Sequence, residues 1–220
     1  MYAFVTGLLG LALASGASAL SVDFRDPAFA PRRGASEHEV VHEGYRFGFG
    51  ALNIESMRHD GSLYWDSRDG FGIIGAGWER DEIELPEVLR LSFGESLFVE
   101  QLVVTDLFVE GSDRYAEQGL YSLDGGLVWT PFESDGIDDN GEMTVIVNGT
   151  ADYVLLTTAG RGRAASGRSF QFEFSLAGVA VERAPGPLVP EPSTALLFVL
   201  AVWIVGRFGR LAFRRGSARG

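Results

Sequence analysis

Hydrophobic and polar residues alternate with a period of two through the central part of the chain. From Tyr45 to Phe49, for example, aromatic side chains alternate with arginine and glycine. Successive side chains of a β-strand point to opposite faces of the sheet. The alternation therefore predicts half-buried strands with aromatic and aliphatic side chains on one face. The same pattern is present in two further stretches, residues 88–93 and 170–176.

Short sequences that favour tight turns separate these runs. Asp-Gly and Asn-Gly pairs are typical of hairpin turns, because these residues accept the left-handed backbone that such turns need. We expect one hairpin around Asp124-Gly125-Gly126, with residues 120–123 and 128–130 in its two strands. The other turn sequences are Asp60-Gly61, Asp69-Gly70, Gly94-Glu95, Asn140-Gly141 and Asn148-Gly149.

Many short strands joined by regular turns are typical of all-β proteins. We therefore predict that residues 20–183 form an all-β domain, an antiparallel β-sandwich of jelly-roll-like arrangement. No long stretch between the two ends of the chain has the period of an amphipathic helix. Two flanking helices are predicted, one in each terminal segment.

The N-terminal segment is apolar and ends in small residues. Residues 4–14 form a hydrophobic core of the length found in secretory signal peptides, and Ala17-Ser18-Ala19 is a small-x-small cleavage site. We therefore predict a signal-peptide helix over residues 1–19. Ala17 and Ala19 are the residues that signal peptidase would read. The prediction implies export through the Sec translocon.

The C-terminal segment combines an apolar run with a basic end. Thr194 to Val205 carries no charge, and continuing to Phe213 gives the roughly 20 residues that a membrane-crossing helix needs. We predict a transmembrane helix over about residues 194–213, which a Pro/Gly linker at 184–189 connects to the domain. The positive-inside rule places the basic end in the cytoplasm. The membrane-stop arginines are Arg207, Arg210, Arg214 and Arg215.

Composition narrows the class of protein. The chain has no cysteine, so it has neither a disulfide framework nor thiolate chemistry. Residues 20–190 hold 13 arginines and 29 acidic residues, a net charge of −16. This charge repels nucleic acid and anionic membrane surfaces, which excludes a nucleic-acid-binding function. It keeps an exported protein soluble and could attract divalent cations.

The order of features at the C-terminus resembles a known sorting signal. Pro190-Glu191-Pro192 is followed at once by the apolar run and then by the arginines, in a tail that covers residues 190–220. This arrangement resembles the PEP-CTERM signal of Gram-negative bacteria, which exosortases read. The resemblance implies that an exosortase in the inner membrane recognises Pro190, Glu191 and Pro192 and cleaves the chain near them. On this interpretation the three residues belong to a substrate and none is catalytic.

The resemblance also implies a location and a context. PEP-CTERM proteins pass through the inner membrane to the cell surface or extracellular matrix, where they accompany exopolysaccharide and biofilm. A second resemblance to such exported proteins lies in residues 70–74, Asp81-Glu82-Ile83-Glu84 and residues 87–93. We therefore expect a secreted, non-enzymatic protein with exopolysaccharide as a candidate partner. The alternative for the tail is a plain C-terminal membrane anchor.

His38-Glu39-Val40-Val41-His42 matches the pattern of zinc peptidases. In those enzymes two histidines on one helical face bind zinc, and the glutamate activates water. Here the two central valines are β-branched, Gly44 follows, and the next residues alternate, all of which favours a strand. Histidines four residues apart in a strand lie roughly 13 Å from each other, too far to share a metal ion. We expect two surface histidines on a polar strand face, and a zinc metallopeptidase is the less favoured alternative.

The densest acidic stretch is residues 135–142. Carboxylate oxygens close together on a turn suit calcium, which takes about 6–8 oxygen ligands. A solvated turn between strands is the alternative. A second, weaker acidic turn runs from Asp66 to Gly70. The candidate calcium ligands are Asp135, Asp138, Asp139 and Glu142.

Aromatic side chains provide a candidate glycan site. They could stack on sugar rings if they lined one concave sheet, although aromatic residues of a sandwich are more often core or edge residues. No serine lies in a Gly-x-Ser-x-Gly elbow. The main alternative to a sorted surface protein is therefore a membrane-anchored protein that binds glycan or calcium. The aromatic candidates are Tyr64, Trp65, Trp78 and Trp129.

Overall fold

A computed structural model describes residues 19–75, 81–110, 115–136, 141–163 and 169–183. The chain divides into two compact units, residues 1–184 and 185–220, and every described residue belongs to the first. Apart from Ala19, the predicted signal peptide lies outside the described residues, as do the linker, the sorting signal and the transmembrane helix. Within the described ranges, no helix is long and apolar enough to cross a membrane.

The regular elements of the described ranges are strands and one short 3-10 turn, η1 (Pro27–Phe29). The strands are β1 (Leu20–Asp23), β2 (Glu37–His42), β3 (Tyr45–Asn53), β4 (Ser62–Asp66), β5 (Gly70–Ile74), β6 (Glu87–Thr105), β7 (Val109–Glu110), β8 (Tyr115–Ala116), β9 (Gln118–Ser122), β10 (Thr130–Glu133), β11 (Met143–Thr158), β12 (Arg161–Arg163), β13 (Ser169–Gln171) and β14 (Ser175–Arg183).

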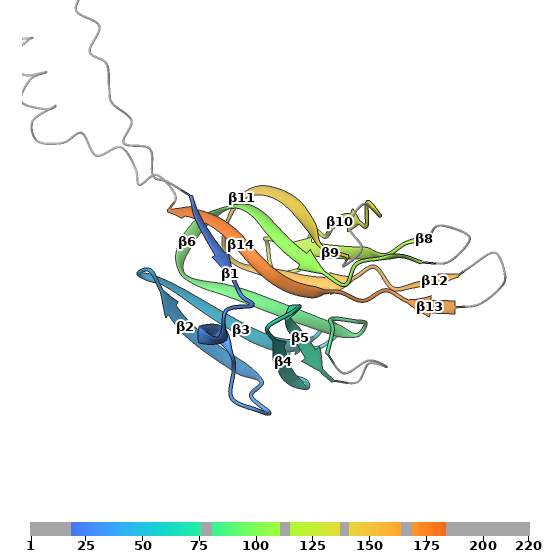
Figure 1. The fold of residues 1–220 in the computed structure, drawn as a ribbon, viewed down its shortest axis with the longest axis horizontal. Helices are drawn as coiled ribbons and strands as arrows, with labels where there is room; N and C mark the ends of the chain where they lie inside the picture. Colours follow the sequence, from blue (N-terminus) through green and yellow to red (C-terminus); the bar gives the residue numbers. More distant parts are fainter. Residues whose placement is uncertain (1–18, 76–80, 111–114, 137–140, 164–168, 184–220) are drawn as a thin grey trace, which may run out of the picture. The chain divides into compact units, whose positions relative to one another are not determined.

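Ten of these strands join in one antiparallel sheet, which confirms the predicted all-β class (Figure 1). Its order is β10-β9-β11-β6-β14-β5-β4, with β1 hydrogen-bonded to β14 and with β2 attached through β3 to β6. The pairs β7–β8 and β12–β13 form two small additional ribbons.

Two long strands curl the sheet. β6 pairs with β3 through residues 87–93 and with β14 through residues 97–105, so two different strands share one of its edges. On the other edge β11 follows β6 along most of its length, with two register shifts. Such β-bulges bend a strand and increase its twist. Figure 1 shows both long strands bending, and the sheet therefore encloses one inner face.

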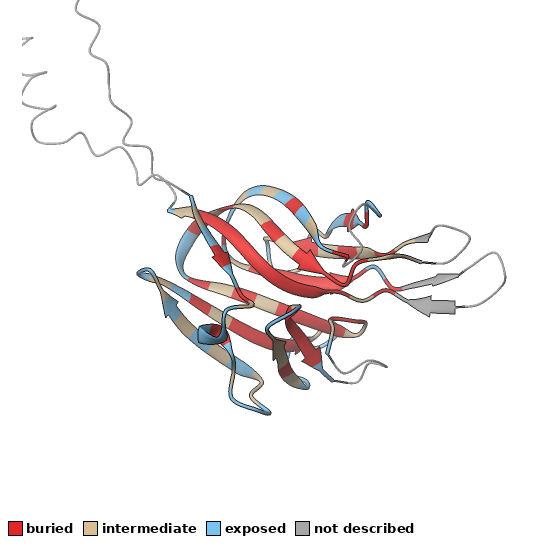
Figure 2. Cartoon of the chain, in the orientation of Figure 1, coloured by how far each residue is buried: buried red, intermediate tan, exposed pale blue. Residues whose placement is uncertain are grey.

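The inner face of the curled sheet holds the hydrophobic core. Figure 2 shows that β14 and β5 are almost entirely buried. The rings of Phe49 in β3 and Phe71 in β5 stack with their centroids 3.8 Å apart. Phe24, which follows β1, contacts both rings edge-on, at 5.0 Å and 6.2 Å. Burial of one such side chain contributes about 1.5–3 kcal/mol, so this aromatic cluster stabilises the approach of β3 to β5.

A missing side chain in β5 allows a loop to cross the strand. A Cβ added to Gly72 would lie 1.7 Å from the carbonyl oxygen of Asp81. The N–H of Ile73 donates to the carbonyl of Glu82 at 3.2 Å, which fixes the crossing. The glycine-rich stretch 70–74 and the acidic stretch 81–84 of the sequence are therefore packed against each other.

Local predictions held where alternation and turn chemistry agreed. Residues 45–49 lie in β3, and residues 88–93 lie in β6. The hairpin around Asp124-Gly125-Gly126 is confirmed, but its strands β9 and β10 end at Ser122 and begin at Thr130, so its loop is longer than predicted. The prediction of one strand over residues 170–176 was wrong. β13 ends at Gln171 and β14 begins at Ser175, because Phe174 turns aside to form an isolated bridge with Ile83.

Two predicted turns lie inside long strands. Gly94-Glu95 is part of β6, and Asn148-Gly149 is part of β11 at a register shift. Asn148 has the left-handed φ of 49° that also suits a turn. A β-bulge and a turn need the same backbone conformation, so the local sequence did not distinguish them.

Candidate functional site

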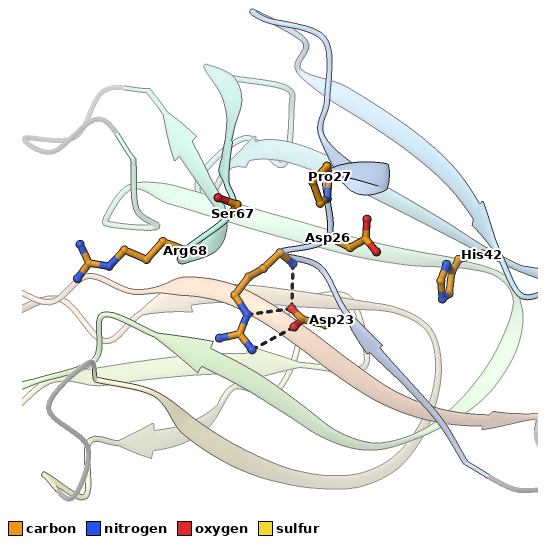
Figure 3. A pocket seen from close by; sticks show the side chains of 7 residues that line it. Asp23, Asp26, Pro27, His42, Ser67 and Arg68 are labelled. Carbon is orange, nitrogen blue, oxygen red and sulfur yellow. Dashed lines mark hydrogen bonds and ion pairs between the residues drawn. The ribbon is translucent and has the colours of Figure 1, made fainter.

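An open pocket of about 570 Å³ lies beside the end of β1 (Figure 3). Its wall comes from β1, η1, the end of β2 and the turn between β4 and β5. The pocket wall is polar and carries both positive and negative side chains. Figure 3 shows the Arg68 side chain extending away from Asp23 and His42. The lining residues are Asp23, Arg25, Asp26, Pro27, His42, Ser67 and Arg68.

Arg25 connects β1 to the start of β11. Its Nε donates to Asp23 Oδ1 at 2.9 Å, and its Nη1 donates to Glu142 Oε2 at 2.7 Å. The hydrogen bonds from Arg25 hold the pKa of Asp23 below its usual value, and Asp23 in turn raises the pKa of Arg25. Both carboxylates are thus engaged by one guanidinium group.

Asp26 has a structural task at the pocket wall. Its side chain accepts a hydrogen bond from the backbone N–H of Ala28 at 2.8 Å and so caps η1. Pro27 follows at the first position of the turn, where its fixed φ suits a helical start. The cap positions Phe29 in the aromatic cluster, where it lies 5.2 Å from Phe24.

The turn between β4 and β5 carries two carboxylates next to this pocket. Asp66 Oδ1 accepts hydrogen bonds from the backbone N–H groups of Arg68 and Asp69, both at 2.8 Å. Asp66 Oδ2 accepts one from the Tyr64 hydroxyl at 3.1 Å. Burial, and then this bond, raises the pKa of Tyr64 to about 12. Burial and the charge of Asp66 raise the pKa of Asp69.

Asp106 lies directly after β6 and faces this turn. The Thr105 hydroxyl donates to the carbonyl of Asp69 at 2.8 Å, which joins the end of β6 to the turn. Asp106 is only 7% exposed, and its Oδ2 is buried with no hydrogen-bond partner. Burial, and then the negative charge of Asp69, raise its pKa to about 6.

Glu82 adds a further, half-buried carboxylate, whose Oε2 atom is buried with no hydrogen-bond partner. Its loop is held in place by the hydrogen bond from Ile83 N–H to the carbonyl of Phe174 at 2.7 Å. Burial, followed by the charges of Glu173 and Asp106, raises the pKa of Glu82 to about 10. We refer to the carboxylates that influence one another here as the acidic cluster, and its members are Asp66, Asp69, Asp81, Glu82 and Asp106.

Sequence reasoning did not identify the acidic cluster. It recognised the turn from Asp66 to Gly70 as a weak acidic turn, but Glu82 and Asp106 come from separate segments. They meet only because the loop at 81–84 crosses β5 and β6 ends against the β4–β5 turn. No local sequence pattern predicts that these carboxylates lie close together.

The predicted calcium ligands are only partly described. Asp138 and Asp139 lie outside the described residues, Asp135 is exposed, and the Glu142 carboxylate accepts its bond from Arg25. Where side chains are described, no group of three or more His, Asp or Glu residues is arranged to hold a metal ion.

The histidines of the zinc-like motif lie on a strand. His38 and His42 belong to β2, so the helix that a zinc peptidase needs at this motif is not formed. The prediction that these two histidines lie at the surface, on a polar strand face, was wrong. Both are half-buried, with His38 stacked 6.5 Å from Phe49 and His42 5.4 Å from Phe29, measured between ring centroids. Burial lowers the pKa of His38.

Trp65 and Trp129, two of the described aromatic candidates for a glycan site, pack against different hydrophobic clusters. The indole N–H of Trp65 donates to the carbonyl of Phe24 at 2.7 Å, and Trp65 packs against the main core. Trp129 packs against a separate cluster of Leu52, Val88 and Leu155. Trp78 lies outside the described residues.

The sorting-signal residues lie outside the described ranges. Ala17 and the whole of 190–220 lie outside the described residues, including Pro190, Glu191, Pro192, Arg207, Arg210, Arg214 and Arg215. Ala19 is exposed and immediately precedes β1.

Comparison with known proteins finds no match to this chain among family models, curated proteins or solved structures.

Proposed function

We propose that the chain is an exported, non-enzymatic surface or extracellular-matrix protein that an exosortase sorts at Pro190-Glu191-Pro192. The observation that carries the proposal is the order of parts along the sequence. An apolar leader precedes one domain, and the Pro-Glu-Pro motif, an apolar run and a cluster of arginines follow it. The Sec translocon and signal peptidase would act first, and the exosortase would act in the inner membrane.

The pairing of the first and last strands is compatible with processing at both ends. Leu20, the first residue of β1, lies opposite Val181 of β14, two residues before that strand ends at Arg183. Cleavage after Ala19 would leave β1 whole, and cleavage near Pro190 would leave β14 whole. Both events would therefore release the domain without removing any strand residue.

The charge of the domain suits a protein that leaves the membrane. The net charge of −16 over residues 20–190 opposes adsorption to anionic lipid.

We infer that the curled sheet is a jelly-roll-like β-sandwich, an inference that rests on the two long strands shared by both halves of the sheet. Association with exopolysaccharide and biofilm is part of the same proposal.

Intact mass spectrometry tests the sorting proposal. Mature protein from wild-type cells is expected to lack residues 1–19 and the arginine-rich end, whereas protein from cells without the exosortase should retain the tail in the inner membrane. Replacing Pro190, Glu191 and Pro192 by alanine should reproduce the second result. A wild-type protein that keeps its tail would instead establish a membrane-anchored protein and overturn the proposal.

A further inference from the structure

Asp106 has an unmet electrostatic requirement. Asp106 is only 7% exposed, and its Oδ2 atom is buried with no hydrogen-bond partner among the described residues. Burial of an unpaired carboxylate is unfavourable, so buried acidic groups in proteins are normally paired or bound to a metal ion. Asp106 therefore calls for a partner that carries positive charge.

No arginine of the described structure supplies that charge fully. Arg68 is the only cation among the charges that dominate at Asp106, where Asp69, Asp66 and Asp81 all act in the opposite direction. The Arg68 side chain is 74% exposed, and its Nε lies 3.5 Å from Asp69 Oδ1. Arg25 also acts on Asp69, but it is already bonded to Asp23 and Glu142. The local balance of charge remains negative.

The hydrogen bonds around the turn decide which carboxylates are available. Asp66 accepts bonds through both oxygens, from Tyr64 and from two backbone N–H groups. Asp69 is bonded through its backbone carbonyl to Thr105, and this bond holds the residue beside Asp106. Among the carboxylates of this turn and of the end of β6, Asp69 and Asp106 therefore have oxygens left for a ligand.

We propose that a calcium ion binds between the β4–β5 turn and the end of β6, with the carboxylates of Asp69 and Asp106 as its protein ligands. Calcium prefers hard oxygen donors and tolerates irregular geometry, whereas magnesium requires a near-ideal octahedron. Two carboxylates leave several coordination positions for water. The affinity should accordingly be weak, at about 10⁻⁴–10⁻³ M, as in extracellular modules.

This site differs from the calcium loop expected from the sequence. The N–H of Leu107 donates to the carbonyl of Gly141 at 3.2 Å, so the segment that begins at Gly141 lies next to Asp106. Glu142 is nevertheless occupied by Arg25. The proposal assigns the ligands to Asp69 and Asp106 and does not depend on sorting by an exosortase.

Calcium titration of the full chain in detergent tests the proposal, with heat of binding and thermal unfolding as readouts. Wild type should bind calcium and unfold at a higher temperature in its presence, as ligand linkage requires. Asp106→Asn and Asp69→Asn should each weaken binding by about tenfold or more. Asp106→Asn should also unfold at a higher temperature than wild type without calcium, because the unpaired buried charge is gone.

Asp152→Asn is the matched control, because Asp152 is an exposed aspartate of β11 away from the cluster. It should bind calcium as wild type does. Equal calcium binding by Asp106→Asn, by Asp69→Asn and by wild type would overturn the proposal. So would a stabilisation that magnesium, or sodium chloride of matched ionic strength, reproduces in full.

Discussion

The hydroxyl of Thr105 donates a hydrogen bond to the backbone carbonyl of Asp69 at 2.8 Å. The two residues are 36 positions apart, and this bond joins the last residue of β6 to the turn between β4 and β5. Thr105 is 3% exposed, so the bond is shielded from water. The relative positions of the Asp69 and Asp106 carboxylates therefore depend on a buried contact that neither carboxylate makes itself.

Replacing Thr105 by valine should loosen this contact. Valine matches threonine in shape but lacks the hydroxyl, so the Asp69 carbonyl loses that donor. The free energy of unfolding should fall by about 1–2 kcal/mol. Calcium binding should weaken as well, because the turn is no longer held beside Asp106. Urea unfolding and calorimetric titration measure the two effects.

Thr144→Val is the control for this prediction. Thr144 is an exposed residue of β11, and the same loss of a hydroxyl there should change stability by less than about 0.5 kcal/mol. If both valine variants had the stability and calcium affinity of wild type, the bond would have no role in positioning the turn.

Gly72→Ala should be strongly destabilising. The added Cβ would lie 1.7 Å from the Asp81 carbonyl oxygen and 2.9 Å from the Glu82 Cα, both of which are backbone atoms that cannot rotate away. Overpacking of this kind typically destabilises by about 1–3 kcal/mol, and more where backbone must shift. Chemical denaturation measures the loss.

Gly50→Ala provides the matched strand glycine. Its added Cβ would approach only the Arg90 and His59 side chains, at 3.4–3.5 Å, which is ordinary contact. This variant should unfold within about 1 kcal/mol of wild type. Similar stability of the two alanine variants would contradict the packing of the 81–84 loop across β5.

The sequence predicted what depends on near neighbours. Alternation identified β3 and the first half of β6, and turn chemistry identified the β9–β10 hairpin, because both are set by residues a few positions apart. The β-branched valines likewise predicted that residues 38–42 would be a strand and not a zinc-binding helix. These features need no information from distant parts of the chain.

The sequence did not predict contacts between segments that are far apart along the chain. The curl of the sheet arises because β6 pairs with β3 at one end and with β14 at the other, and no local pattern specifies this. His38 and His42 were expected to be exposed because their partners, Phe49 and Phe29, approach from other elements. The acidic cluster was not predicted for the same reason, because its carboxylates come from separate segments of the chain.

The half-buried carboxyl group of Glu82 should make stability depend on pH. Its pKa is about 10 in the folded protein, against an ordinary value of 4.5, so the folded state retains a proton that the unfolded state loses. Stability should therefore fall as pH rises from about 5 to 10. Glu82→Gln resembles the protonated form and should be more stable than wild type at neutral pH by several kcal/mol, on the order expected for such a shift.

The difference between the two proteins should grow with pH and vanish near pH 4. Urea unfolding at pH 4, 7 and 9 measures it. Glu95→Gln serves as the control, since Glu95 is exposed and pairs with Arg183 at the surface. A constant difference between wild type and Glu82→Gln across this range would show that Glu82 is ionised in the folded protein.

The boundaries of the domain lead to a prediction about truncated chains. β1 pairs with β14 along its whole length, buries Val22 to 3% exposure, and leads to Phe24, whose carbonyl accepts the Trp65 indole N–H. A chain of residues 20–183 should fold with the stability of the full protein, because it retains every strand. A chain of residues 24–183 lacks β1 and should lose at least about 2 kcal/mol through the missing burial of Val22 and the unpaired edge of β14. Thermal and urea unfolding of both chains measures the difference in stability. Equal stability of the two would show that β1 is dispensable and that cleavage after Ala19 has no structural significance.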